Sequence, residues 1–413
     1  MKRPIGIDLF AGAGGLSLGF EQAGFDVVAA VESDPVHCAV HKFNFPATRI
    51  VPRSARRITG DDIRRMAGIG DREVDCVFGG PPCQGFSLIG RRALDDPRNG
   101  LVRDFVRLVA ELDARTFVFE NVKGLTVGRH RQILDGLIGE FAAAGYAVNT
   151  PWRVLNAANY GVPQRRERVI LFGARKDLPP PDYPAPLTGI RGGTGKGNDR
   201  PPGPSCADAL ADLPDAEGYE ALMSSDVLTT PVYGAPSPYA AALRCVTHGA
   251  WHAGYPRRWD PGLLTSSART RHTAASRSRF AATDPGSIEP VSRFYRLPAE
   301  GVANTLRAGT DRTRGSFSSP RPIHYRHDRC VTVREMARLH GFPDWFRFHV
   351  TKWHGARQVG NAVPPPLARA LAESVLRSIG AEPIRPEKEI DLGDPMLLRL
   401  NLSRASQYFA TVV

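Results

Sequence analysis

The segment Ile5-Gly-Ile-Asp-Leu-Phe-Ala-Gly-Ala-Gly-Gly-Leu16 predicts a buried strand that turns through glycines into a helix. The apolar run at its start is typical of such a strand, and the helical pattern after the glycines extends to about Ala23. Further strand-like runs, separated by helical patterns, follow at 25–31, 74–78, 116–119 and 168–172. This alternation indicates βαβ units, so we expect an α/β fold with a doubly wound, mostly parallel sheet.

The glycine turn and the end of the second strand together suggest a nucleoside site. Gly12, Gly14 and Gly15 permit positive φ angles and a close approach of the backbone to a ligand. Their spacing differs from the Gly-x-Gly-x-x-Gly dinucleotide pattern, and no phosphate-binding lysine accompanies them. Glu32 follows the second strand about 20 residues later, where an acid suits two ribose hydroxyls. The alternative is an ordinary structural turn.

A cysteine follows the third of these strand-like runs. The stretch Phe78-Gly-Gly-Pro-Pro-Cys-Gln-Gly-Phe-Ser87 places Cys83 in a loop at the carboxyl edge of the sheet, where α/β folds bind ligands. Two prolines stiffen the approach, and the flanking glycines leave the sulfur open. We interpret Cys83 as a candidate nucleophile, provided that a nearby arginine or a helix N-terminus favours the thiolate. An incidental loop thiol is the alternative.

Three charged residues could assist that cysteine. Glu120 follows the run 116–119 and therefore lies at the same sheet edge. A nucleophile with an adjacent acid is the arrangement of acid-assisted covalent catalysis, although a glutamate at a strand end is commonly a solvated cap. Arg166 and Arg168 could bind an anion or a carbonyl oxygen if they point into the cleft, or they could form an exposed turn.

The charge of the chain is strongly positive. Its 413 residues include 54 Lys and Arg against 42 Asp and Glu, a formal charge of +12. Between 240 and 330, fifteen arginines and six acidic residues give a net charge of +9, interleaved with aromatic residues and histidines. This pattern predicts a nucleic-acid surface, with a solvated basic face as the alternative. Residues 177–330 are also rich in Gly, Pro, Ser and Arg, so we expect a second, smaller and irregular domain there.

The sequence disfavours several classes of protein. No uncharged apolar run approaches 18 residues, so we expect no membrane span, and the first residues lack the apolar run of a signal peptide. The six cysteines include no Cys-x-x-Cys pair, which argues against a zinc ribbon or a disulfide framework. We therefore expect a cytoplasmic protein without a metal site.

Six ordered blocks of the sequence resemble the cytosine-5 DNA methyltransferase family. They are Asp8–Gly15, Gly80–Gln84, Glu120–Val122, Gln164–Arg168, Val333–Pro343 and Gln358–Val363. The resemblance covers about 1–175 and 330–380, and it implies a Rossmann-like fold. It divides the chain into a catalytic and S-adenosylmethionine-binding domain (1–176), a target-recognition domain that holds DNA (177–330), a returning segment that completes the catalytic domain (331–380) and a C-terminal extension (381–413). No function is predicted for the extension.

The resemblance also implies roles for individual residues. Cys83 is the nucleophile, Glu120 is the acid at ring N3 and the exocyclic amine, and Arg166 and Arg168 orient the base and the catalytic loop. The implied cofactor site comprises Phe10, Gly12, Ala13, Gly15, Glu32, Ser33, Pro81, Leu101, Asn361 and Val363. The implied DNA contacts are Gln84 and Ser87 on the catalytic loop, with Thr305, Leu306 and Arg307 near the end of the recognition region.

One position departs from the family's pattern. The family usually has an acid after the third strand that bonds the adenine amine, whereas this sequence places Ser54 there. A shifted register would use Asp62, but Asp62 looks like part of a helix start, while Ser54 follows the strand-like run 48–51. A hydroxyl accepts the same bond without charge assistance, so we expect weaker cofactor binding, unless Asp61 or Asp62 substitutes.

The predicted reaction is methyl transfer from S-adenosylmethionine to carbon 5 of a cytosine in a short duplex DNA sequence. The target cytosine must leave the base stack to be reached. We expect a monomer of the restriction–modification type, which protects DNA from a cognate endonuclease acting on the same site. Two alternatives stay open. A transfer-RNA cytosine-5 methyltransferase carries the same blocks but lacks a large recognition region, and a non-catalytic relative would be expected to lose Cys83, Glu120 or the glycine turn.

Overall fold

The protein is described by a computed structural model that covers residues 2–82, 100–128, 130–191, 200–310 and 319–412. Within these residues, the main sheet has eight strands in the order β3-β2-β1-β4-β5-β8-β6, with β7 also beside β8. The strands are β1 (Ile5–Leu9), β2 (Asp26–Val31), β3 (Arg49–Val51), β4 (Cys76–Gly79), β5 (Thr116–Val122), β6 (Tyr146–Val148), β7 (Arg153–Asn156) and β8 (Glu167–Arg175).

The sheet is parallel from β3 to β5 and antiparallel beyond. Strand β5 pairs with β8 along its whole length, from Thr116 opposite Ala174 to Val122 opposite Arg168. The predicted strand 116–119 is therefore three residues too short, and Glu120 lies inside β5 rather than after it. The cause is this antiparallel neighbour, which supplies hydrogen-bond partners past the point where the apolar run stops.

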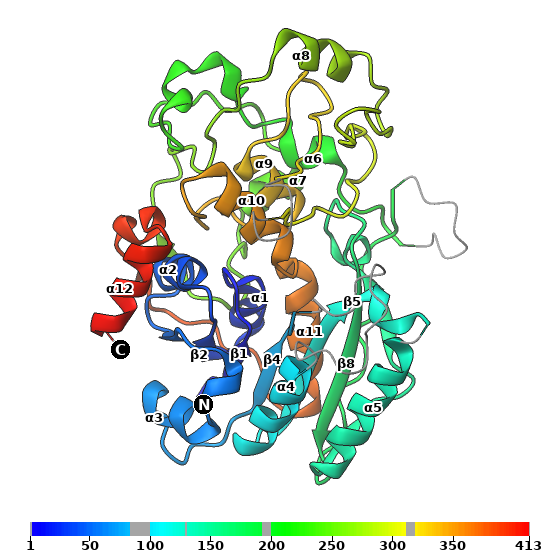
Figure 1. Ribbon diagram of the computed structural model, residues 1–413, viewed down its shortest axis with the longest axis vertical. Coiled ribbons are helices and arrows are strands. Elements are labelled where there is room, and N and C mark those ends of the chain that lie inside the picture. Colours follow the sequence, from blue (N-terminus) through cyan, green and yellow to red (C-terminus); the bar gives the residue numbers. More distant parts are fainter. Residues whose placement is uncertain (1, 83–99, 129, 192–199, 311–318, 413) are drawn as a thin grey trace.

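Helices cover both faces of the sheet, as expected for a doubly wound fold. On one face, the side chains of α3 (Gly60–Ala67), α4 (Gly100–Glu111) and α5 (His130–Ala143) pack on alternate strand residues such as Val77. On the other face, α1 (Gly15–Ala23) and α11 (Pro365–Ser378) pack on the intervening residues such as Phe78. Figure 1 shows α11, from late in the sequence, beside α1. The predicted α/β fold with a mostly parallel sheet is confirmed.

A glycine allows α1 and α11 to approach closely. A Cβ atom added at Gly19 would lie 2.4 Å from the Cβ of Ala368, closer than two carbon atoms can pack. Helix α11 belongs to the segment 331–380, which was predicted to return to the catalytic domain, and it spans Pro365–Ser378. Helices α1 and α11 can therefore pack closely, because the residues at their contact, Gly19 and Ala368, are small.

The region above the sheet is irregular and contains short helices. It includes α6 (Cys206–Leu210), α7 (Pro238–Leu243), α8 (Ala274–Ala281) and the two-residue strand β9 (Arg257–Arg258). The next helices, α9 (Val333–Leu339) and α10 (Lys352–Asn361), share a buried core with Leu210, Leu297 and Leu306 of this region. The division of the chain at residue 330 stays a prediction, because α9 and α10 pack on the irregular region and α11 packs on the sheet.

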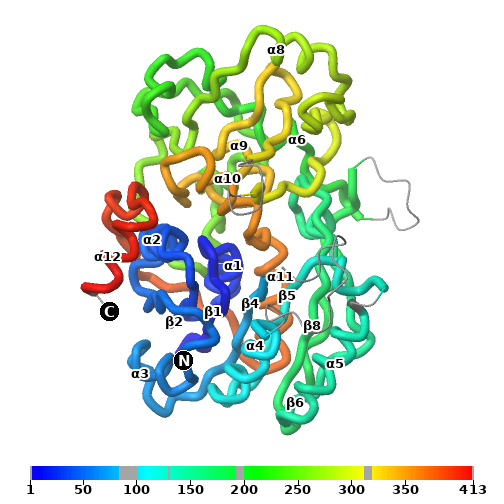
Figure 2. Tube along the Cα trace, in the orientation of Figure 1, coloured from blue at the N-terminus to red at the C-terminus, as the bar shows by residue number. Residues whose placement is uncertain are grey.

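The C-terminal extension forms a strap along one side of the molecule (Figures 1 and 2). Its strand β10 (Ile390–Asp391) pairs with β9, and the Gly393 N–H donates to the carbonyl of Phe43. Leu397, Leu398 and α12 (Leu402–Val412) then cover α2 (Pro35–Asn44), and the Leu398 carbonyl accepts from the N–H of Val350. The strap therefore connects the sheet domain, the irregular region and the segment before α10.

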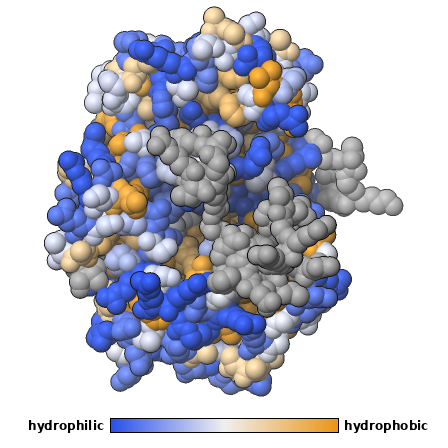
Figure 3. All heavy atoms as spheres, in the orientation of Figure 1, coloured by the Kyte–Doolittle hydropathy of each residue, from blue (hydrophilic) through white to orange (hydrophobic). Residues whose placement is uncertain are grey.

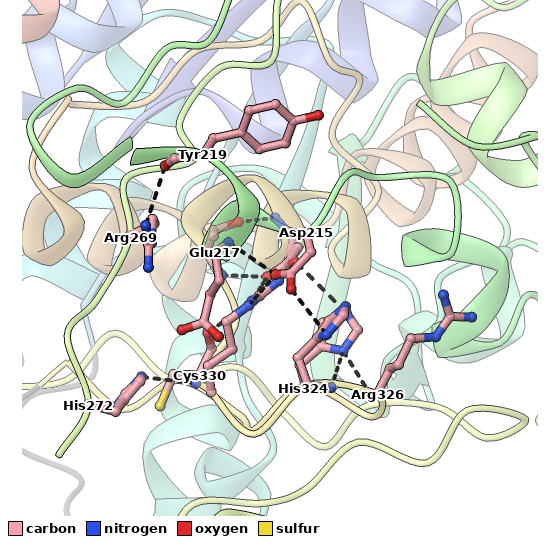
Figure 4. A network of polar contacts seen from close by, with 12 residues as sticks. Asp215, Glu217, Tyr219, Arg269, His272, His324, Arg326 and Cys330 are labelled. Carbon is pink, nitrogen blue, oxygen red and sulfur yellow. Dashed lines mark hydrogen bonds and ion pairs between the residues drawn. The ribbon is translucent and has the colours of Figure 1, made fainter. Parts of the chain in front are cut away.

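Most of the positive charge between 240 and 330 is neutralised inside the protein. Eight of the thirteen arginines that the structure describes in this range form ion pairs: Arg244, Arg257, Arg258, Arg269, Arg277, Arg279, Arg296 and Arg329. Figure 4 shows Asp215, Glu217 and His324 within one such network. The charge available to an external anion is therefore smaller than the +9 of the sequence.

The described surface is of mixed polarity. Figure 3 shows hydrophilic and hydrophobic residues interspersed over the face that it displays. Among the helices within the described residues, none combines the length and apolar character that a membrane crossing requires.

Candidate active site

Glu120 and Arg168 form a buried ion pair at the carboxyl edge of the sheet. The Nε atom of Arg168 lies 2.7 Å from Oε1 of Glu120, and the two side chains are only 10% and 11% exposed. Glu120 faces Ile170 and Arg168 faces Val122 in the β5–β8 register, so the two charged residues are diagonal neighbours on one face of the sheet. The pairing of the strands thus fixes the position of the carboxylate.

The same carboxylate lies against the backbone that leads to Cys83. A Cβ atom added at Gly80 would be 2.5 Å from Oε2 of Glu120, so only glycine fits at this position without a shift of that side chain. The next residue, Asn121, donates from Nδ2 to the carbonyl of Pro81 over 3.2 Å. The predicted site residues Cys83, Gln84 and Ser87 lie outside the described residues.

Arg166 connects the sheet to two distant segments. It is buried, and its terminal nitrogens donate to the carbonyls of Leu306 (3.0 Å) and Gly360 (2.9 Å). Burial, and then the neighbouring charge of Arg168, lowers the pKa of Arg166. The backbone at Gly360 is in close contact with the recognition region. An added Cβ at Gly360 would lie 2.5 Å from the backbone nitrogen of Ala308.

Gln164 and His340 form a second connection between the same segments. Leu306 donates from its N–H to Oε1 of Gln164, whose Nε2 is 2.8 Å from Nδ1 of His340. The other ring nitrogen of His340 is 3.0 Å from the carbonyl of Ala362. Burial lowers the pKa of His340, so the ring is neutral and its proton lies on Nε2, toward that carbonyl. No role was predicted for these two residues, although both lie in blocks that resemble the family.

The glycine turn and Glu32 lie together at the ends of β1 and β2. Phe10, Gly12 and Gly14 have positive φ angles of 63°, 54° and 104°. Glu32 accepts from the N–H groups of Gly12 (2.9 Å), Ser33 (2.7 Å) and Asp34 (2.8 Å). An added Cβ at Gly12 would meet no atom within 4 Å, so this backbone faces open space. An open turn beside an acidic acceptor fits a nucleoside with two hydroxyl donors.

The returning segment closes the other side of this turn. An added Cβ at Gly15 would lie 2.4 Å from the carbonyl oxygen of Val363. The structure thus brings Val363 to the start of α1, although about 350 residues separate them. The remaining predicted cofactor residues are placed as follows: Ala13 is buried in the turn, Asn361 ends α10, Leu101 is in the first turn of α4, and Ser54 follows β3 and caps the short helix 55–57.

Comparison with known families settles what kind of protein carries this site. The model of the family described as C-5 cytosine-specific DNA methylase matches residues 5–377. The chain belongs to this family. Membership implies that the methylase acts on DNA and that S-adenosylmethionine is its methyl donor. The alternative of a transfer-RNA methyltransferase is not favoured.

Relatives of this methylase include restriction–modification enzymes. It is 56% identical over 409 residues to the Type II methyltransferase M.XorII of Xanthomonas oryzae pv. oryzae, an alignment that covers 99% of this chain and 93% of the relative. A prophage-encoded E. coli protein, described as a DNA modification methyltransferase, has a solved structure with 31% identity and a TM-score of 0.72, covering 91% and 99% of the two chains. The structure of S. pombe Dnmt2 (14% identity, TM-score 0.54, 92% and 99% covered) shares the fold.

A buried histidine beneath the glycine turn makes the methylase sensitive to acid. His41 packs on Phe45, and its Nδ1 is 3.4 Å from the carbonyl of Gly12. Burial lowers the pKa of His41 to about 4, whereas an unfolded histidine titrates near 6.5. Between these values the unfolded chain binds more protons than the folded one, so the free energy of unfolding falls as the pH drops from about 6.5 to 4, by up to about 3 kcal/mol for this residue.

Urea unfolding at pH 7.5, 6 and 5 measures this effect. The variant His41→Gln keeps a donor for the Gly12 carbonyl but cannot titrate, and we expect a weaker dependence of its stability on pH than in the wild type. His248→Gln is the matched control, because His248 is exposed. Equal pH dependence in the wild type and in His41→Gln contradicts the assignment.

Proposed function

We propose that this methylase transfers a methyl group to carbon 5 of a target cytosine by covalent catalysis through Cys83, assisted by Glu120. The observation that carries the proposal is the Glu120–Arg168 pair, which is buried at the carboxyl edge of the sheet and lies against Gly80, three residues before the cysteine. Arg168 holds the carboxylate in one orientation at the place where the chain leads toward Cys83, and this supports a shared role of the two residues on one ring.

The roles of the residues follow from the chemistry of cytosine, whose carbon 5 is a poor nucleophile. The Cys83 thiolate bonds to carbon 6, and the electron density displaced by this bond makes carbon 5 enamine-like. As negative charge develops at N3, Glu120 would act as the acid and donate a proton there, and it would take this proton back when the adduct collapses. Bound S-adenosylmethionine supplies the methyl group. Once carbon 5 carries it, the carbon 5 proton leaves and the bond between sulfur and carbon 6 breaks, which regenerates the thiolate.

The proposed cofactor site is the turn between β1 and α1 with its surroundings. Phe10, Gly12, Ala13 and Gly15 would line it, Glu32 would accept from the ribose hydroxyls, and Ser33 would flank the adenine. Pro81, Leu101, Asn361 and Val363 would complete it. Ser54 is favoured over Asp62 for the adenine amine, because Ser54 directly follows β3, whereas Asp62 lies in the first turn of α3, where it accepts from Thr59 and pairs with Arg65.

The proposed DNA site lies between the catalytic domain (1–176) and the recognition domain (177–330). Gln84 and Ser87 would contact DNA from the catalytic loop, and Thr305, Leu306 and Arg307 from the recognition domain. Arg166 is a positioning residue in this scheme, since its guanidinium bonds to Leu306 and Gly360. Flipping the cytosine costs roughly a few kcal/mol, which phosphate contacts would offset. Each phosphate whose charge the enzyme neutralises should add about −0.9 to the slope of the logarithm of the DNA-binding constant against the logarithm of the salt concentration.

In the cell, we propose a monomeric enzyme of a Type II restriction–modification system. The name of the relative M.XorII supports this context. The methylase would modify a short specific sequence and so protect it from a cognate endonuclease, which acts on the same site without necessarily binding to this chain.

Expression in a bacterial host without cytosine-5 methylation, followed by bisulfite sequencing of the genomic DNA, tests this function. We expect one short motif to become methylated at one cytosine in nearly all its copies. The Cys83→Ser variant serves as the control and should leave the genome unmodified. A genome without 5-methylcytosine after expression of the folded wild-type protein contradicts the proposal, and so does radiolabel transfer to transfer RNA in preference to duplex DNA.

A further inference from the structure

Three arginines that have no acidic partner among the described residues line one pocket. Arg293, Arg307 and the buried Arg321 all line it, together with Tyr295, Asn304 and Thr305. None of these arginines has a carboxylate within 4 Å in the described part of the chain, in contrast to the eight paired arginines of the same region. The pocket therefore concentrates the charge that the recognition region leaves uncompensated.

The pocket is fixed to the catalytic sheet. Thr305 Oγ1 donates to the carbonyl of Arg165 over 2.7 Å, and the next residue, Leu306, bonds through its carbonyl to Arg166 and through its N–H to Gln164. The two residues that flank this anchor, Asn304 and Arg307, both line the pocket. A ligand in the pocket is therefore held next to the proposed catalytic centre.

The polar groups of the pocket are mostly donors without protein partners. Arg293 and Arg307 are exposed, and the Asn304 amide has no hydrogen bond within the described residues. Arg321, only 8% exposed, donates to the Val331 carbonyl and the Thr270 hydroxyl but leaves its Nε without a partner. No lining residue carries a carboxylate. Such a pocket suits a group rich in acceptors and disfavours an exposed amine such as that of cytosine.

Arg293 is presented by a rigid turn. Its φ angle is +62°, a left-handed conformation that costs a non-glycine residue about 1 kcal/mol or more. The turn keeps this conformation because the N–H of Arg293 donates to the carbonyl of Glu289, whose buried carboxylate accepts from the N–H of Val291 and pairs with Arg279. Strained backbone held in this way commonly marks a functional position.

We propose that Arg293, Asn304 and Arg307 form a subsite that reads a guanine of the duplex beside the target cytosine. Guanine presents two acceptors, O6 and N7, to the major groove, and an arginine fork can bond to both at once. A backbone phosphate is the other acceptor-rich group in DNA, but the aromatic wall of Phe294 and Tyr295 suits a flat base better. This inference rests on the proposed function and adds the residues that set its sequence specificity.

The test compares the wild type with Arg293→Gln and Arg307→Gln on duplexes that carry the methylated motif, and on a set in which each base pair is replaced in turn. We expect at least one variant to lose discrimination at a single guanine position by about 5- to 150-fold in kcat/KM, with other positions unchanged. Replacing that guanine by 7-deazaguanine should slow the wild type and have little effect on the variant. Arg271→Gln is the matched control, since Arg271 is exposed in the same region but does not line the pocket.

Several outcomes overturn the inference. A uniform loss on all duplexes, with a salt slope reduced by about one, identifies a phosphate contact instead. Unchanged preferences in both variants, or a methylated motif whose only guanine is the partner of the target cytosine, exclude the subsite while leaving the proposed function intact. If the wild type methylates no duplex DNA at all, the proposed function fails first. Both arginines are exposed, so we expect neither substitution to destabilise the fold. A midpoint of thermal unfolding equal to that of the wild type verifies that each variant is folded.

Discussion

Replacement of Cys83 by serine is expected to reduce methyl transfer by roughly four orders of magnitude or more, because an alcohol is far less ionised at neutral pH than a thiol. Binding of S-adenosylmethionine and of duplex DNA should change little, since the proposed cofactor residues and the recognition region are untouched. Radiolabel transfer to DNA measures the first quantity, and equilibrium binding measures the other two.

A duplex with 5-fluorocytosine at the target position gives a second measurement of the same step. Fluorine cannot leave as a proton does, so the wild-type enzyme should remain covalently attached to this DNA and migrate as an adduct under denaturing conditions. Cys245→Ser is the matched control, because Cys245 is a free thiol of the recognition region and has no predicted catalytic role. This variant should form the adduct as the wild type does. A Cys83→Ser protein that still methylates cytosine contradicts the assignment of the nucleophile.

Replacement of Glu120 by glutamine is expected to lower kcat by about 10²- to 10⁴-fold, the usual contribution of a positioned acid. The amide is close in size to the carboxyl group, and its oxygen can still accept from Arg168, but it has no acidic proton to donate to N3. The dissociation constant for the cofactor should stay within a few-fold of the wild type, because Glu120 is not among the proposed cofactor residues. Single-turnover kinetics separates this chemical step from binding.

Two variants control for the loss of a charge at this place. Glu167→Gln removes the adjacent but exposed partner of Lys123, and it should leave kcat nearly unchanged. Arg168→Gln leaves the Glu120 carboxylate buried without its cation, so it should lower both kcat and the free energy of unfolding, the latter by about 3–5 kcal/mol. A Glu120→Gln enzyme with wild-type kcat contradicts the role of the acid.

Local patterns in the sequence predicted the sheet domain well. The alternation of apolar runs and helical segments follows from neighbours in the chain, so β1, α1 and β2 lie within one or two residues of their expected positions. The approach of Glu120 to Gly80, just after β4, was also predictable, because neighbouring parallel strands end at one edge of the sheet. The extension of β5 was not, since it depends on an antiparallel partner about 50 residues later.

Long-range polar contacts could not be predicted from the sequence for a similar reason. Nothing near Gln164 indicates that its amide connects Leu306 to His340, and nothing near Arg166 indicates that its guanidinium bonds to Gly360. The charge between 240 and 330 was predictable only in part. Its total was visible in the sequence, but its pairing with acids such as Glu21, Asp215 and Glu389 depends on the fold.

The contact between the glycine turn and the returning segment has a consequence for synthesis of the protein. As a chain leaves the ribosome, β1 and α1 emerge first, yet the apolar face of α1 is covered by α11 only after residue 378 has been made. Until then the part of α1 around Gly19 lacks its cover, and the glycine turn lacks its contact with Val363. Because the proposed cofactor site includes that contact, we expect a chain that ends before α11 to bind S-adenosylmethionine weakly and to be inactive.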